Sequence, residues 1–116
     1  MENLILENTM NLPPEISVTE LKALMDSKAD VTVIDVREPH EYQISNIGAR
    51  LVPLGSFGGI VGELDPDLHY VIHCRSGKRS AEACGLLRAM GFARVQNLAG
   101  GILAWADQID PAMQKY

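Results

Sequence analysis

The residues best suited to chemistry in this chain lie together in the segment Cys74–Ser80. Arg75, Lys78 and Arg79 supply three cations there, out of ten lysines and arginines in the whole chain. The thiolate is the nucleophilic form of cysteine, and cationic surroundings favour it. Cys74 is therefore the candidate nucleophile, and its surroundings also suit an anionic substrate.

The flanking sequence indicates how Cys74 is positioned. An apolar run over 70–72 predicts a buried parallel strand, and an alanine-rich pattern over 81–90 predicts a helix. Cys74 is then expected on a tight loop between them, where backbone N–H groups and the positive helix end point at its ligand. The residues expected to bind the substrate are Arg75, Ser76, Gly77, Lys78 and Arg79.

The two cysteines receive opposite interpretations. A free cysteine is usually a small buried apolar residue, and Cys84, inside the predicted helix, is interpreted in that way. The same interpretation is disfavoured for Cys74, because packing requires neither a glycine nor three cations in the next five positions. Their separation of ten residues fits neither a C-x-x-C pair nor a zinc site, so no metal is expected.

The composition is that of one soluble domain. The chain has 116 residues, 47% of them hydrophobic and 22% charged. Its net charge of −5 argues against partners such as nucleic acid or an anionic membrane surface. No signal peptide or membrane span is recognised, which makes the cytoplasm the expected location. We expect a leader over 1–14, a domain over 15–110 and a tail over 111–116.

The remaining pattern alternates strands with helices. Ser17 and Glu20 form a capping box for a helix that ends near Ser27. Asp35 and Arg37 close a β-branched strand over 31–36, and they are interpreted as a supporting ion pair or cap rather than as acid–base catalysts. Further strands are predicted over 50–53 and 94–98, further helices over 56–64 and 102–109, and a short helix with Pro39 in its first turn. This order predicts an α/β fold with a parallel sheet covered on both faces.

Two details of the later helices complete the expectations. The helix after Cys74 is expected to bury Ala83, Cys84, Leu87 and Met90 and to stop at Gly91 in a Schellman motif. Trp105 in the closing helix is interpreted as a core anchor.

The motifs, taken in order, resemble the rhodanese domain. They are Asp35-Val36-Arg37, Cys74 to Ser80, Gly91-Phe92 and Gly100-Gly101-Ile102-x-Ala104-Trp105. The residues 42–48 and the ending 104–111 are similar to the carboxy-terminal sulfurtransferase domain of enzymes that adenylate sulfur carriers in molybdopterin or thiamin synthesis.

The resemblance implies a five-stranded parallel sheet and a sulfurtransferase that carries a persulfide on Cys74. A small anionic donor such as thiosulfate supplies the sulfur, and a thiol or a protein accepts it. Ser80, Asp35 and Arg37 are expected to support the loop, and no cofactor is needed.

Two alternatives remain open from the residues. The first is a persulfide relay or partner-binding module of the same fold, acting in sulfur-carrier, tRNA or cofactor thiolation. The second is a cysteine phosphatase or arsenate reductase. Those families use a similar loop with the pattern Cys-x₅-Arg. Here the arginine falls one place earlier, at Arg79, and Ser80 occupies the phosphatase position. This spacing counts against phosphoryl transfer.

Overall fold

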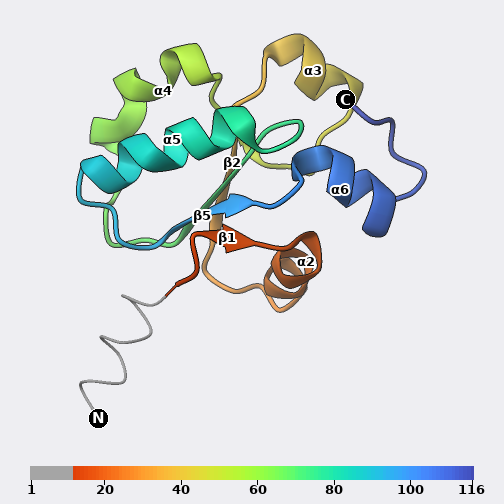
Figure 1. Ribbon diagram of the computed structural model, residues 1–116, viewed down its shortest axis with the longest axis horizontal. Coiled ribbons are helices and arrows are strands. Elements are labelled where there is room, and N and C mark those ends of the chain that lie inside the picture. Colours follow the sequence, from red (N-terminus) through yellow and green to blue (C-terminus); the bar gives the residue numbers. More distant parts are fainter. Residues whose placement is uncertain (1–11) are drawn as a thin grey trace.

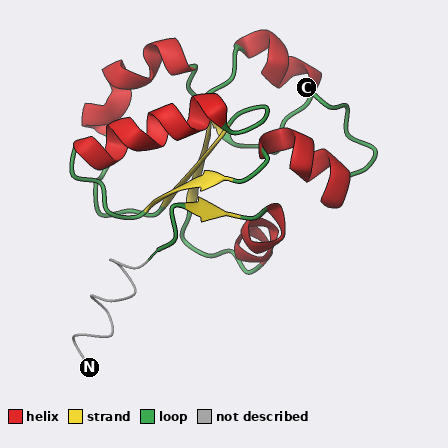
Figure 2. Ribbon diagram, in the orientation of Figure 1, coloured by secondary structure: helices red, strands yellow, loops and turns green. Residues whose placement is uncertain are grey.

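The computed structural model describes residues 12–116, and its centre is a five-stranded parallel sheet with helices on both faces (Figure 1, Figure 2). The strand order is β1-β5-β4-β2-β3, which places β4 in the middle. The strands are β1 (Glu15–Ile16), β2 (Thr32–Asp35), β3 (Arg50–Leu51), β4 (Tyr70–His73) and β5 (Val95–Leu98). The α/β sheet expected from the sequence is confirmed.

Two layers of helices cover the sheet. They are α2 (Val18–Asp26), α3 (Pro39–Ile44), α4 (Leu54–Ile60), η1 (Val61–Glu63), α5 (Lys78–Ala89) and α6 (Gly101–Gln108). Phe57 of α4 and Leu87 of α5 belong to one core cluster, whereas Leu21 of α2 and Trp105 of α6 belong to the other. Figure 1 shows α4 and α5 side by side above the sheet and α2 below it. None of the helices in residues 12–116 is long and apolar enough to cross a membrane.

Strand β4 is buried on both faces, as expected for the middle of a covered parallel sheet. Its side chains alternate between the two clusters, so Tyr70 and Ile72 pack toward α4 and α5 while Val71 packs toward α2 and α6. Cys74 follows β4 and continues this alternation into the α5 side. Cys74 therefore lies at the carboxyl edge of the sheet, beneath the first turn of α5.

Helix α5 differs from the sequence prediction at both ends. It begins at Lys78, three residues earlier than expected, because Gly77 takes a left-handed φ of +113° and starts the helix directly from the loop. The expectation that Met90 is buried is wrong, since 60% of it is exposed. The helix ends at Ala89 in the predicted Schellman motif, and Phe92 packs into the core instead.

The other elements follow the sequence closely. The capping box of α2 is present, with Ser17 Oγ accepting from Glu20 N–H at 3.1 Å and Glu20 Oε1 accepting from Ser17 N–H at 3.0 Å. Trp105 is buried as predicted. Strand β1 has no counterpart among the patterns identified in the sequence, because two residues are too few to show a period. It begins just after the predicted leader 1–14, most of which lies outside the described residues.

Candidate active site

The Cys74 sulfur lies in a cradle of hydrogen-bond donors made by the loop that follows β4. Gly77 N–H donates to Cys74 Sγ at 3.1 Å, and Ser80 Oγ lies 3.3 Å from the same sulfur. Both donors come from the start of α5, whose N-terminus carries partial positive charge. The residue is only 1% exposed, so the sulfur sits at the floor of the loop.

These donors make the Cys74 thiol more acidic. Burial raises its pKa, but hydrogen bonds from the Ser80 hydroxyl and from the N–H groups of Ser80, Gly77 and Ser76 outweigh burial and bring the pKa below its ordinary value. The thiolate is thus favoured by neutral donors of the loop, of which the sequence predicted the backbone N–H groups but not the Ser80 hydroxyl.

Cys84 has the opposite environment. It lies on the core-facing side of α5, fully buried in the core cluster, and burial raises the pKa of its thiol to about 12. A neutral buried thiol is a poor nucleophile. This agrees with the interpretation of Cys84 as a packing residue.

Asn97 of β5 holds the loop from the neighbouring strand. Its Oδ1 lies 2.6 Å from Ser80 Oγ and shares the single proton of that hydroxyl with Cys74 Sγ, while its Nδ2 donates to the Gly77 carbonyl at 3.0 Å. Asn97 is 6% exposed, so this amide has little water to bond to instead. Sequence reasoning missed Asn97, although an amide within a strand predicted to be buried was a usable signal.

Helix α6 holds the loop from the opposite face of the sheet. Its first N–H groups donate to loop carbonyls, Ile102 N–H to Cys74 at 3.0 Å and Leu103 N–H to Arg75 at 3.2 Å. This approach requires glycine at position 101, because a Cβ there would lie 2.5 Å from the Arg75 carbonyl oxygen. The Gly100-Gly101 pair of the sequence motif therefore has a direct structural reason.

The three predicted cations have different surroundings. Arg79 donates to Glu41 through both terminal nitrogens, at 2.7 and 2.9 Å. Arg75 is exposed, with its guanidinium 5.8 Å from the centre of the Tyr116 ring. Lys78 is exposed in the first turn of α5. The three cations thus lie on the loop and in the first turn of α5, but one of them is bonded to a carboxylate of the chain.

Asp35 and Arg37 form an ion pair that is wholly buried. Arg37 Nη2 donates to Asp35 Oδ2 at 2.8 Å, and both side chains are inaccessible to solvent. Arg37 also donates to the carbonyls of Glu41 at 3.3 Å and Ser45 at 2.7 Å. The pair bonds to the backbone of α3 and of Ser45 just after it rather than to Cys74. Its connection to the loop runs through Glu41, which is bonded to Arg79.

His73 lies beside this pair on the same face of the sheet. Its Nε2 is 3.5 Å from Asp35 Oδ2, and burial lowers its pKa. A neutral imidazole is therefore favoured there.

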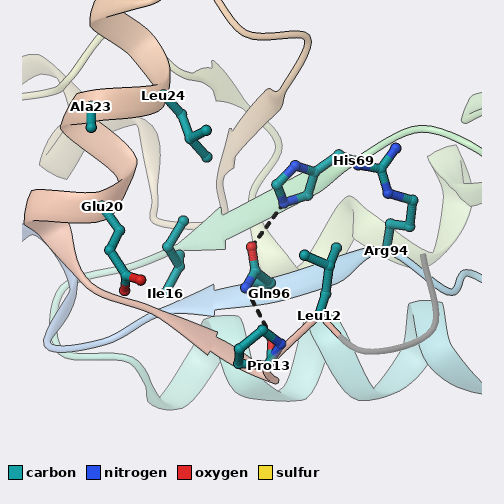
Figure 3. Close-up of a pocket in the computed structure, with 9 residues that line it drawn as sticks. All are labelled: Leu12, Pro13, Ile16, Glu20, Ala23, Leu24, His69, Arg94 and Gln96. Atoms are coloured by element: carbon teal, nitrogen blue, oxygen red, sulfur yellow. Dashed lines mark hydrogen bonds between the residues drawn. The ribbon is translucent and has the colours of Figure 1, made fainter. Parts of the chain in front are cut away.

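A separate cavity of about 460 Å³ opens at the other end of the sheet (Figure 3). Its polar side includes His69 Nε2, which lies 2.8 Å from Gln96 Oε1, and Gln96 Nε2, which donates to the Pro13 carbonyl at 3.0 Å. The lining residues are Leu12, Pro13, Ile16, Glu20, Ala23, Leu24, His69, Arg94 and Gln96. Because His69 and Arg94 precede β4 and β5 whereas Cys74 follows β4, this cavity is not the site of Cys74.

Comparison with known proteins assigns the domain to a family. A family model described as the rhodanese-like domain matches residues 17–108. The probable adenylyltransferase/sulfurtransferase MoeZ of Mycobacterium tuberculosis is 40% identical over 104 residues, which cover 87% of this chain and 26% of MoeZ. A sulfurtransferase of Allochromatium vinosum is 39% identical over 93 residues, covering 79% of this chain and 87% of that protein.

Solved structures agree with the family match. The human single domain sulfurtransferase TSTD1 superposes with a TM-score of 0.74 at 25% identity, covering 84% of this chain and 98% of the human one. The chain spans about a quarter of the length of MoeZ but most of the length of the single-domain relatives. Sequence match, strand order and the cysteine loop at the end of β4 agree, and the chain belongs to the rhodanese-like domain family.

Proposed function

We propose that the protein is a sulfurtransferase that carries sulfane sulfur as a persulfide on Cys74. In the first half-reaction the Cys74 thiolate attacks the outer sulfur of a donor such as thiosulfate. The bond between the two donor sulfurs breaks, and its electron pair leaves with sulfite. Cys74 then bears an S–S⁻ group, so the negative charge of the thiolate is carried by the new outer sulfur.

In the second half-reaction an acceptor thiolate attacks that outer sulfur. The Cys74 thiolate leaves, the acceptor becomes a persulfide, and the enzyme returns to its starting state. No electron is gained or lost from outside in either step. A small thiol or a protein thiol supplies the same chemistry, and both are acceptors in this proposal.

One observation carries the proposal, namely the set of donors around Cys74 Sγ. The Gly77 N–H donates to the sulfur from 3.1 Å, the Ser80 hydroxyl oxygen lies 3.3 Å from it, and burial excludes most water from it. Fixed donors of this kind stabilise a thiolate and a charge that develops next to it without reorganising during the reaction. We assign Ser76, Gly77 and Ser80 to this donor set, and Arg75 and Lys78 to the attraction of an anionic donor at the mouth.

The names of the single-domain relatives support the same reaction type, because those from Allochromatium vinosum and human are called sulfurtransferases. Asp35 and Arg37 enter the proposal as support for α3, since they bond to its backbone rather than to the sulfur.

The proposal is tested by mass spectrometry of the protein after incubation with thiosulfate and removal of the excess. We expect a mass increase of one sulfur atom on the peptide that contains Cys74, and its loss when a thiol acceptor is added. Cys74→Ser should abolish the increase, because a hydroxyl cannot carry a persulfide. Cys84→Ser is the matched control and should retain it, with some loss of stability from a polar group in the core.

The same preparations should hydrolyse an aryl phosphate negligibly, because the loop from Cys74 to Arg79 is one residue shorter than in the phosphatase pattern. Efficient aryl-phosphate hydrolysis without any persulfide on Cys74 would overturn the proposal.

A further inference from the structure

Arg79 is already bonded to a carboxylate of the chain itself. Its Nη1 and Nη2 donate to the two oxygens of Glu41 at 2.7 and 2.9 Å, in the paired geometry that fits a guanidinium to a carboxylate. The Glu41 side chain is 7% exposed and that of Arg79 is 35% exposed. The Arg79 charge at the mouth of the loop is therefore largely balanced before any substrate arrives.

Glu41 is a fixed part of the site rather than a mobile surface group. Besides the Arg79 bonds, its Oε1 accepts from the Glu38 N–H at 2.9 Å, and its backbone carbonyl accepts from Arg37. The Arg79 hydrogen bonds, together with the smaller effect of the Glu38 N–H, outweigh burial and lower the pKa of Glu41 to about 2. Glu41 is thus a permanent anion at any physiological pH.

This anion changes the charge that a sulfur donor meets. With Arg79 balanced by Glu41, Arg75 and Lys78 remain as the exposed cations of the loop. Arg75 contacts the Tyr116 ring, so part of its surface is covered as well. The donor must in addition approach a thiolate. A doubly charged donor is repelled by the thiolate, and the balanced Arg79 offsets little of that repulsion, whereas a donor of lower charge is repelled less.

We infer that Glu41 determines the charge of the donor that the site prefers, favouring hydropersulfides, R–S–SH, over dianions such as thiosulfate. This inference rests on the proposed function. The Cys74 thiolate attacks the outer sulfur of R–S–SH, the S–S bond breaks, and R–S⁻ leaves with the electron pair. The proton stays on the transferred sulfur, so Cys74–S–SH forms and loses that proton to water. Glu41 acts through Arg79 and is a specificity-determining residue.

The inference is tested by measuring the rate of Cys74 persulfide formation with two donors, the dianion thiosulfate and the hydropersulfide of mercaptoethanol, which carries at most one negative charge. The wild type should react faster with the hydropersulfide. Glu41→Gln should raise the thiosulfate rate by about threefold to tenfold, as expected for one charge at a partly solvated site. The hydropersulfide rate should rise by a smaller factor, at most about the square root of the thiosulfate factor, because its charge is at most half as large. Inhibition by sulfate, a dianion that does not react, should become stronger in the same variant.

Three controls separate charge from shape. Glu41→Asp keeps the charge and should retain the wild-type ratio of the two rates. Glu63→Gln removes an exposed carboxylate of η1 and should leave both rates unchanged. The double variant Glu41→Gln/Arg79→Gln removes both charges of the pair, so its donor ratio should stay near that of the wild type. The double variant also provides the test if Glu41→Gln alone does not fold.

An equal fall of both rates in Glu41→Gln would show that the ion pair only holds the loop and would overturn the inference. An unchanged ratio with unchanged sulfate inhibition would overturn it too. By contrast, absence of a Cys74 persulfide from either donor in the wild type would refute the proposed function itself.

Discussion

Replacing Gly101 by alanine should damage the site more than any comparable change of a glycine on the surface. Its φ of +58° is left-handed, which costs an alanine about 1 kcal/mol. The new Cβ would also lie 2.5 and 2.6 Å from the carbonyl oxygens of Arg75 and Cys74, so the loop or α6 must move. Forcing one extra carbon into a packed region costs about 1–3 kcal/mol. We therefore expect the free energy of unfolding to fall by about 2–4 kcal/mol.

Gly48→Ala is the matched control for this prediction. Gly48 also has a left-handed φ, +81°, but no atom lies within 4 Å of the Cβ that would be added. Its substitution should therefore cost only about 1 kcal/mol. Urea unfolding followed by the fluorescence of Trp105, the only tryptophan in the chain, measures both variants. The alkylation rate of Cys74 should fall only in Gly101→Ala, because only there is the loop displaced.

Equal losses of stability in the two variants, with unchanged alkylation of Cys74, would refute this reasoning. That result would mean that α6 can withdraw from the loop at no cost. The two hydrogen bonds from α6 to the loop carbonyls would then contribute nothing to the shape of the site.

Three further predictions follow from the same contacts. Ser80→Ala should raise the pKa of Cys74, because it removes a donor to the sulfur, and the alkylation rate as a function of pH would then show a higher midpoint than in the wild type. Arg37→Leu should cost about 3–5 kcal/mol in urea unfolding, because it leaves the buried Asp35 carboxylate unpaired; a loss below 1 kcal/mol would contradict this. The Glu41 pKa is lowered from 4.5 to about 2, so Glu41 contributes stability above pH 4.5 that is lost as the pH falls toward 2. Acid unfolding of Glu41→Gln should lack that part of the pH dependence.

The sequence was sufficient to predict those features of the structure that neighbouring residues determine. The capping box at Ser17, the Schellman motif at Gly91 and the placement of Cys74 between a strand and a helix each depend on neighbouring residues. Met90 was predicted wrongly for a reason that is also local. Helical spacing placed it on the buried face, but the helix ends one residue earlier and Phe92 fills that part of the core.

The contacts that define the site were not predictable in this way. Glu41 and Arg79 are 38 residues apart, and Ser80 and Asn97 are 17 residues apart. Both pairs meet only because the parallel sheet brings the carboxyl ends of its strands to one edge. The sequence therefore indicated three cations beside Cys74, but only the fold shows that one of them is balanced by a carboxylate.

The strand order has a consequence for when the protein can become active during its synthesis. Asn97, which orients the Ser80 hydroxyl, lies on β5, and the helix that holds the loop carbonyls follows β5. Strand β5 in turn pairs with β4 and with β1, near the beginning of the described chain. Such long-range parallel pairings form late in folding. We therefore expect Cys74 of a chain still emerging from the ribosome to behave as an ordinary thiol, without the lowered pKa of the folded site.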